Sequence, residues 1–166
     1  MPTKPHDDVK PPLPDDGVRI RPLVPGDLDA IVEIDKAMVG RTRRGFYEKR
    51  LGHLAREPAA FVALAAERNS RLVGFVFARV YEGEFGGEVP EAALDAIGVE
   101  AESRHRRVGR RLIDAMSAAM RILGIKEIST QADWTDTELT GFFARMKFAL
   151  APRIVLERSV AETNAD

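Results

Sequence analysis

The sequence predicts an α/β (α+β) domain with a mixed, mostly antiparallel sheet, a central parallel β-α-β crossover and helices on both faces. Two observations support this prediction. The apolar segments 60–65 and 72–78 flank a short polar link, which is the pattern of an antiparallel hairpin. Further along, an amphipathic helix separates the strand-like segments 92–99 and 125–130. Strands joined by such a crossover run parallel, and the connection is right-handed.

The elements before the crossover follow from periodicity and turn residues. Alternating apolar and basic residues predict a first strand over 17–23. Apolar residues at helical spacing predict a helix over 28–38 with Asp27 as its N-cap, and a second helix from 46 to Pro58. A loop with three glycines, 81–90, then leads into the crossover.

The crossover helix has apolar residues at helical spacing and stops at Gly124. These residues are Leu112, Ile113, Met116, Met120 and Leu123. A further helix is predicted over 135–146. The segment 148–160 is expected to close the sheet, with a strand at 154–156.

Length and composition limit the classes of function. The 166 residues suit one domain, and 25 basic against 26 acidic residues give a net charge of -1. A generally basic surface for nucleic acid is therefore not indicated. The absence of cysteine excludes disulfides, cysteine-bound zinc and a cysteine nucleophile.

The folded domain is predicted to span residues 17–160. Residues 1–16 hold five of the ten prolines, which predicts a disordered arm, and 161–166 are expected to form a tail. The first residues lack the apolar core of a signal peptide, and no apolar run could span a bilayer. A cytoplasmic protein without membrane contact is the expectation.

Several well-known site motifs are absent. The chain contains no Gly-x-Gly-x-x-Gly, no Gly-x-x-x-x-Gly-Lys-Ser/Thr and no Gly-x-Ser-x-Gly. His6, His53 and His105 do not have the spacing of metal ligands, so no metal site is predicted.

An arginine-dense loop between 104 and 111 runs directly into the crossover helix. The N-terminus of a helix presents unpaired N–H groups and partial positive charge, which suits a polyphosphate. The arginines could instead form a solvated helix face or a nucleic-acid patch. The net charge and the lack of interleaved aromatic residues argue against nucleic acid.

The motif around this loop resembles the GCN5-related N-acetyltransferase (GNAT) family. Its parts are a strand ending at Val99, then Arg104-x-x-Arg107-x-Gly109, then Leu112-Ile113 on the helix. The stretch 136–148 is similar to a later motif of the family, and the element order matches over 17–160. Four positions depart from the family pattern, namely Arg107 and Lys147 in place of glycine, Asp136 in place of asparagine, and Phe143 in place of tyrosine.

The resemblance implies direct transfer of an acetyl group from acetyl-CoA to an amine, on a small molecule or on a protein. The strand end at Ile97 and Val99 would splay from the next strand and bind the pantetheine arm, and the Val99 N–H would polarise the thioester carbonyl. The pyrophosphate would lie on amides between His105 and Arg110. The implied cofactor-binding residues are Ile97, Val99, Arg104, His105, Arg106, Arg107, Val108, Gly109, Arg110, Asp136 and Phe143.

Two of the departures bear on activity. A left-handed backbone at Arg107 would cost about 1–2 kcal/mol, whereas a helical backbone would remove that cost. Phe143 cannot supply the proton that the family's tyrosine gives to the departing thiolate. Water or Tyr81 would then donate it, or the thiolate would leave unaided. A degenerate domain that binds acyl-CoA as a sensor is therefore the alternative function.

An attacking amine must be neutral, which calls for a base. Asp95 within the strand and Glu100 after it are the candidates. The alternative for Asp95 is a carboxylate paired with an arginine, and for Glu100 a solvated loop position. Tyr47, Arg43 and Arg44 lie where the family binds its acceptor and could select an acidic one. The residues do not fix an oligomeric state, and a homodimer stays open.

Overall fold

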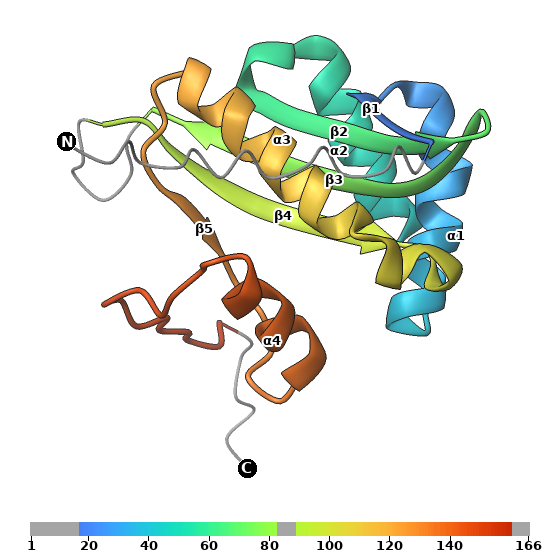
Figure 1. Cartoon of the computed structure of the whole chain (residues 1–166). Coiled ribbons are helices and arrows are strands. Elements are labelled where there is room, and N and C mark those ends of the chain that lie inside the picture. The colour runs from blue at the N-terminus through green and yellow to red at the C-terminus, as the bar shows by residue number, and fades with distance from the viewer. Residues whose placement is uncertain (1–16, 83–88, 161–166) are drawn as a thin grey trace, which may run out of the picture. The chain divides into compact units, whose positions relative to one another are not determined.

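The computed structural model describes residues 17–82 and 89–160 (Figure 1). The arm 1–16, the tail 161–166 and most of the glycine-rich loop lie outside these residues. The chain divides into two compact units, Met1–Gln131 and Ala132–Asp166. No helix in the described part of the chain is long and apolar enough to cross a membrane.

The first unit contains a five-stranded sheet in the order β1-β2-β3-β4-β5. The three pairings from β1 to β4 are antiparallel, and β4 and β5 are parallel, so the predicted mixed sheet is confirmed. The strands are β1 Val18–Pro22, β2 Phe61–Arg68, β3 Arg71–Tyr81, β4 Glu91–Val99 and β5 Ile128–Thr130.

The predicted hairpin is the pairing of β2 with β3. Only Asn69 and Ser70 separate the two strands, and both have positive φ (51° and 59°). A two-residue turn of this kind matches the twist of the flanking strands.

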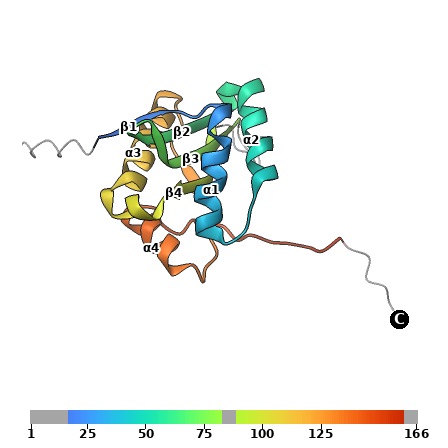
Figure 2. The same ribbon diagram turned by 90° about the vertical axis from the view of Figure 1, so that its right-hand side faces the viewer.

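The helices of the first unit lie on both faces of the sheet (Figures 1 and 2). The helices α1 and α2 cover one face and α3 covers the other. Short 3-10 turns precede α1, follow α2 and precede α3. Their bounds are η1 Pro25–Asp27, α1 Leu28–Val39, α2 Arg44–Arg56, η2 Pro58–Ala60, η3 Ala101–Arg106 and α3 Val108–Ile122.

Two glycines let α1 and α3 approach the sheet closely. A Cβ on Gly98 would lie 2.5 Å from the Phe75 ring and 3.1 Å from Ile34 of α1. A Cβ on Gly74 would lie 3.1 Å from Val108 and 3.2 Å from Leu112, both in α3. Larger residues at either position would push a helix away from the strands.

The face of α3 that packs against the sheet is the face predicted from the helical spacing of its apolar residues. Four of the five predicted residues are buried: Leu112, Ile113, Met116 and Met120. The fifth, Leu123, is 49% exposed because the helix ends at Ile122 and Leu123 belongs to its cap. Gly124 stops the helix with φ +76°.

The second unit contains α4, Thr137–Arg145. The predicted strand at 154–156 is wrong, because the described residues after α4 form no strand. Ile154, Val155 and Leu156 are exposed. Their apolar pattern is typical of a strand, but a strand also needs a neighbour to bond with.

Candidate active site

On the edge of β4 that faces β5, only the first part of the strand has a partner, and we call the rest of this edge open. β5 pairs only with Ala92, Ala93 and Leu94, whereas residues 96–99 of β4 pair with β3 alone. The ladder between the two parallel strands therefore ends at Leu94 and Thr130, before the strand end at which the family resemblance implies a splay. Among the described residues, one edge of β4 is thus without a sheet partner over the five residues 95–99.

The register identifies which backbone groups face this open edge. The Glu100 N–H donates to the Val73 carbonyl at 3.0 Å, so this pair exchanges hydrogen bonds across β3 and β4. In an antiparallel ladder such pairs alternate with pairs whose N–H and C=O point outward. Val99 and Ile97 belong to the outward set, so their backbone groups point to the open edge.

A β-bulge lies where β4 opens. Phe77 pairs with Ala96 and Ala78 pairs with Leu94, which leaves Asp95 without a direct partner on β3. A bulge bends its strand and redirects a side chain. Here the Asp95 side chain lies on the α2 face of the sheet, where it contacts arginine.

Two guanidinium groups hold the Asp95 carboxylate, which is 8% exposed. Arg79 of β3 donates to Oδ2 at 2.6 Å and to Oδ1 at 2.8 Å. Arg50 of α2 places Nε 3.1 Å from Oδ2. A carboxylate has about four acceptor positions. Oδ1 therefore retains capacity for one further hydrogen bond.

The second candidate base, Glu100, lies at the other end of β4 and also contacts arginines. It accepts hydrogen bonds from the Ser103 hydroxyl and from Arg71, both at 2.9 Å, and Arg68 lies 3.7 Å away. Ser103 is fully buried and also accepts a hydrogen bond from Arg68. Glu100 thus joins the β2–β3 hairpin to the loop that leads into α3.

The junction of this loop with α3 forms a concave set of N–H groups. Arg106 ends a 3-10 helix, and Arg107 follows with a left-handed backbone (φ 60°, ψ 14°). Consecutive right- and left-handed residues form an anion-binding nest. The Arg111 N–H donates to the Arg107 carbonyl at 3.0 Å, so the N–H groups of residues 108–110 precede the helical ladder.

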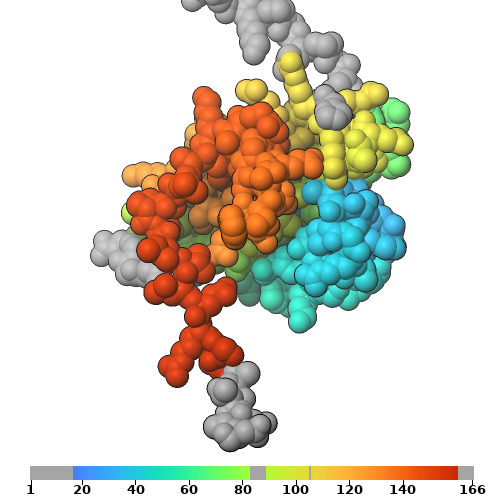
Figure 3. Space-filling model, turned by 90° about the horizontal axis from the view of Figure 1, so that it is seen from below, coloured from blue at the N-terminus to red at the C-terminus, as the bar shows by residue number. Residues whose placement is uncertain are grey.

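The left-handed backbone at Arg107 settles the question that the sequence left open. The strained alternative applies, with its cost of about 1–2 kcal/mol. The Arg107 side chain is exposed, as are those of Arg104, Arg106 and Arg110, while that of His105 lies outside the described part of the structure. In Figure 3 the yellow chain around this junction lies at the surface.

A nest at the N-terminus of α3 and an unpaired edge on β4 are the features that a phosphopantetheine ligand requires. Residues 28–148 match the sequence profile of the acetyltransferase (GNAT) family. The chain belongs to this family. The GNAT family uses acetyl-CoA, and the open edge and the nest fit its pantetheine arm and its pyrophosphate.

One curated relative is mycothiol acetyltransferase of Thermobispora bispora. It is 28% identical over an alignment of 145 residues, and the alignment covers 83% of this chain and 48% of that protein. The chain thus spans about half the length of this relative.

Solved structures confirm the GNAT fold. The aminoglycoside acetyltransferase meta-AAC0020 from a soil metagenomic sample, in complex with sisomicin, superposes with a TM-score of 0.70 at 20% identity, covering 89% of this chain and 99% of that one. The aminoglycoside N-acetyltransferase AAC(6')-Iy in complex with CoA gives a TM-score of 0.74 at 16% identity, with coverage of 87% and 95%.

Three residues that the sequence placed on the acceptor side of this GNAT domain have partners within the fold. Tyr47 is fully buried and donates its hydroxyl to Asp35 at 2.7 Å. Burial and this hydrogen bond raise the pKa of Tyr47. Arg43 donates to the same carboxylate, and Arg44 pairs with acidic residues of α1 and α2. This network joins α1 to α2.

Asp136 and Phe143 both stabilise α4 within the second unit. Asp136 is the N-cap of α4, and its Oδ1 accepts from the Leu139 N–H at 3.0 Å. Phe143 is buried, with ring centroids 5.5 Å from Phe142 and 5.0 Å from Phe148. Asparagine caps a helix as well as aspartate does, so the departure at 136 leaves this local role intact.

Lys147 has a left-handed backbone (φ 67°) just after α4. Its N–H donates to the Ala144 carbonyl, and the Phe148 N–H donates to that of Phe143, both at 3.0 Å. This pattern is a Schellman cap, in which glycine is the favoured residue. Lys147 therefore has the same kind of backbone strain as Arg107.

The structure confirms the alternative in which Asp95 is paired with arginine, but the sequence identified neither its partners nor the arginines that contact Glu100. Arg79 directly follows the apolar run of β3, and Arg68 and Arg71 flank the hairpin turn. Their positions on strands are visible in the sequence. Their partners depend on the register of β3 against β4 and on the bulge, which local patterns do not encode.

Proposed function

We propose that this protein is an acetyl-CoA-dependent N-acetyltransferase that transfers the acetyl group directly to an amine. One observation carries the proposal: the open edge of β4 leads, through η3, into the nest at the start of α3. A ligand with amide groups at one end and a pyrophosphate at the other matches this order of binding groups.

Each part of the site has a role in this proposal. Ile97 and Val99 bind the pantetheine arm through the backbone, and the Val99 N–H polarises the thioester carbonyl. The N–H groups of residues 107–110 bind the pyrophosphate, and exposed arginines of the loop add positive charge. Acetyl-CoA supplies the activated acetyl group.

Asp95 is the base that we propose. It lies at the bulge, two residues before the first outward-facing group of the open edge. Its Oδ1 can accept one more hydrogen bond, from the amine or from a bridging water. Glu100 is a positioning residue in this proposal, because its contacts hold the loop before α3.

A second candidate function, an acyl-CoA sensor with little catalysis, is favoured by Phe143. A phenyl ring cannot protonate the leaving thiolate. Replacement of Phe143 by Tyr distinguishes the two functions. A gain in rate would mean that a missing acid limits the chemistry, whereas CoA binding without acetyl transfer in either form would favour the sensor.

Thermal denaturation with acetyl-CoA, CoA, NADH and duplex DNA tests the proposal. A ligand at about 100 times its Kd stabilises the fold by about 2.7 kcal/mol. At this chain length the Tm rises by roughly 5–10 °C. A rise with acetyl-CoA and CoA, but not with NADH or DNA, is expected. If neither CoA species raises the Tm, the proposal fails.

A further inference from the structure

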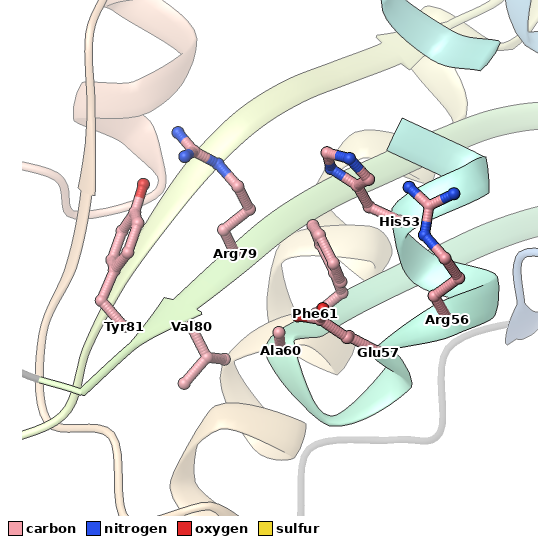
Figure 4. Close-up of a pocket in the computed structure, with 8 residues that line it drawn as sticks. All are labelled: His53, Arg56, Glu57, Ala60, Phe61, Arg79, Val80 and Tyr81. Carbon is pink, nitrogen blue, oxygen red and sulfur yellow. The ribbon is translucent and has the colours of Figure 1, made fainter. Parts of the chain in front are cut away.

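A hollow of about 210 Å³ lies on the α2 side of the first unit. Figure 4 shows His53 and Arg56 of α2 beside it, with Arg79 and Tyr81 of β3 across from them. Phe61, at the start of β2, supplies an apolar wall. The hollow is smaller than the 300–1,000 Å³ typical of sites for drug-sized ligands, so it suits one end of a small molecule.

The charges around this hollow are mainly positive. Two guanidinium groups and an imidazole line it, against the single carboxylate of Glu57. Arg56 and His53 have no ion-pair partner among the described residues, whereas Arg79 is paired with Asp95. The Arg79 guanidinium also lies over the Tyr81 ring, 5.0 Å from the ring centroid. This cation–π contact restricts the conformations of the Arg79 side chain.

Arg79 links the hollow to the site of acetyl transfer. It lines the hollow and also binds Asp95, the bulge residue of β4. Ile97 comes two residues after Asp95 on β4. Because residues in a strand rise about 3.3 Å each, the outward-facing backbone of Ile97 lies about 7 Å along the strand from Asp95. A molecule held in the hollow can therefore extend an amine toward Asp95 and the open edge.

We infer that this hollow binds the carboxylate of the acceptor, so that the enzyme acetylates a carboxylate-bearing amine. The inference rests on the proposed function. Guanidinium groups bind carboxylates through paired hydrogen bonds, and Arg56 has its donors available for one. The aminoglycoside that a structural neighbour binds is polycationic, and like charges repel it from this lining.

The test compares two amines that differ only in charge, 6-aminohexanoate and its amide, 6-aminohexanamide. Both are titrated into the CoA-saturated chain of 166 residues while NMR follows the His53 ring protons. The carboxylate is expected to bind at least tenfold more tightly than the amide. Arg56→Gln should remove most of this preference. Lys49→Gln, which removes an exposed charge from the same helix outside the hollow, should leave it unchanged.

Each outcome decides the inference. Equal binding of the two amines, no binding of either, or a preference that survives Arg56→Gln would overturn it. The affinity for acetyl-CoA, measured on the same samples, tests the proposed function separately. Acetyl-CoA binding with no carboxylate preference would reject the inference alone, whereas loss of acetyl-CoA binding would reject the function.

Discussion

The middle of β4 and the position just after it each carry a carboxylate that is bound by arginines, but the two carboxylates have different surroundings. At the bulge, Asp95 is held by arginines from β3 and α2, and one of these, Arg79, also lines the hollow. At the C-terminal end, Glu100 is held by arginines of the β2–β3 hairpin and fixes the loop before α3. Two carboxylates that both bind arginine can therefore differ in role, and the structural element next to each one decides the role that we propose for it.

Replacement of Asp95 by Asn should have the largest effect. Removal of a general base costs about 10²–10⁴-fold in rate, so kcat is expected to fall at least 100-fold. The Kd for acetyl-CoA should stay within a factor of two, because the proposed function assigns Asp95 to the acceptor and not to acetyl-CoA. Circular dichroism checks that the variant folds. A folded variant with near-normal kcat would remove Asp95 as the base.

Charge reversal at Arg107 tests the opposite end of the site. Arg107→Glu removes a positive charge beside the nest and adds a negative one. Each of these two changes weakens the attraction for the pyrophosphate by about 1 kcal/mol, so the affinity for acetyl-CoA should fall 10- to 30-fold. Lys147→Glu is the matched control, since it makes the same charge change at the other strained position. Calorimetric titration measures both, and equal losses would argue against a specific site at Arg107.

Glu100→Gln should affect cofactor binding rather than the chemical step. The variant weakens the contacts with Arg68 and Arg71 and loosens the loop before α3. We expect about a threefold higher Kd for acetyl-CoA, in line with the strength of partly exposed ion pairs, and a kcat within a factor of two. A pH profile of kcat that loses its acidic limb in this variant would instead identify Glu100 as the base, because a catalytic carboxylate is inactive when it is protonated.

Lys147→Gly should raise stability without affecting binding. Glycine removes the left-handed penalty of about 1–2 kcal/mol, but it also gives the unfolded chain more conformational freedom to lose on folding. The net gain in the free energy of unfolding is then about 0.5–1 kcal/mol. The Tm is then expected to rise by about 1–4 °C. Arg107→Gly should give a similar gain. Lower stability in both variants would contradict the assignment of strain.

Asp27 is an arginine-bound carboxylate away from β4 and serves as a reference for a purely structural pair. Burial opposes its charge, but hydrogen bonds from Arg21 and from the Val24 N–H lower its pKa below the ordinary 3.8. Its contribution to stability is therefore present above pH 4 and is lost as the pH falls through the lowered pKa. In Asp27→Asn, the free energy of unfolding should therefore fall less steeply as the pH is lowered below 4. Urea unfolding at a series of pH values measures this dependence.

Patterns of local periodicity predicted the sheet, the helices and the turn at Asn69, because burial on one face imposes spacing on nearby residues. The open edge at Ile97 and Val99 followed from the family motif. The bulge at Asp95 and its pairing with Arg79 depend on contacts between distant segments, and the segment around Val155 shows that apolar alternation alone does not make a strand.

Hydrogen exchange of the backbone amides, followed by NMR with and without acetyl-CoA, tests the central claim most directly. We predict slower exchange at Ile97, Val99 and residues 108–110, with little change at Ala93, which already pairs with β5. Binding of acetyl-CoA that leaves these amides unprotected, or that protects a different part of the chain, would contradict the account.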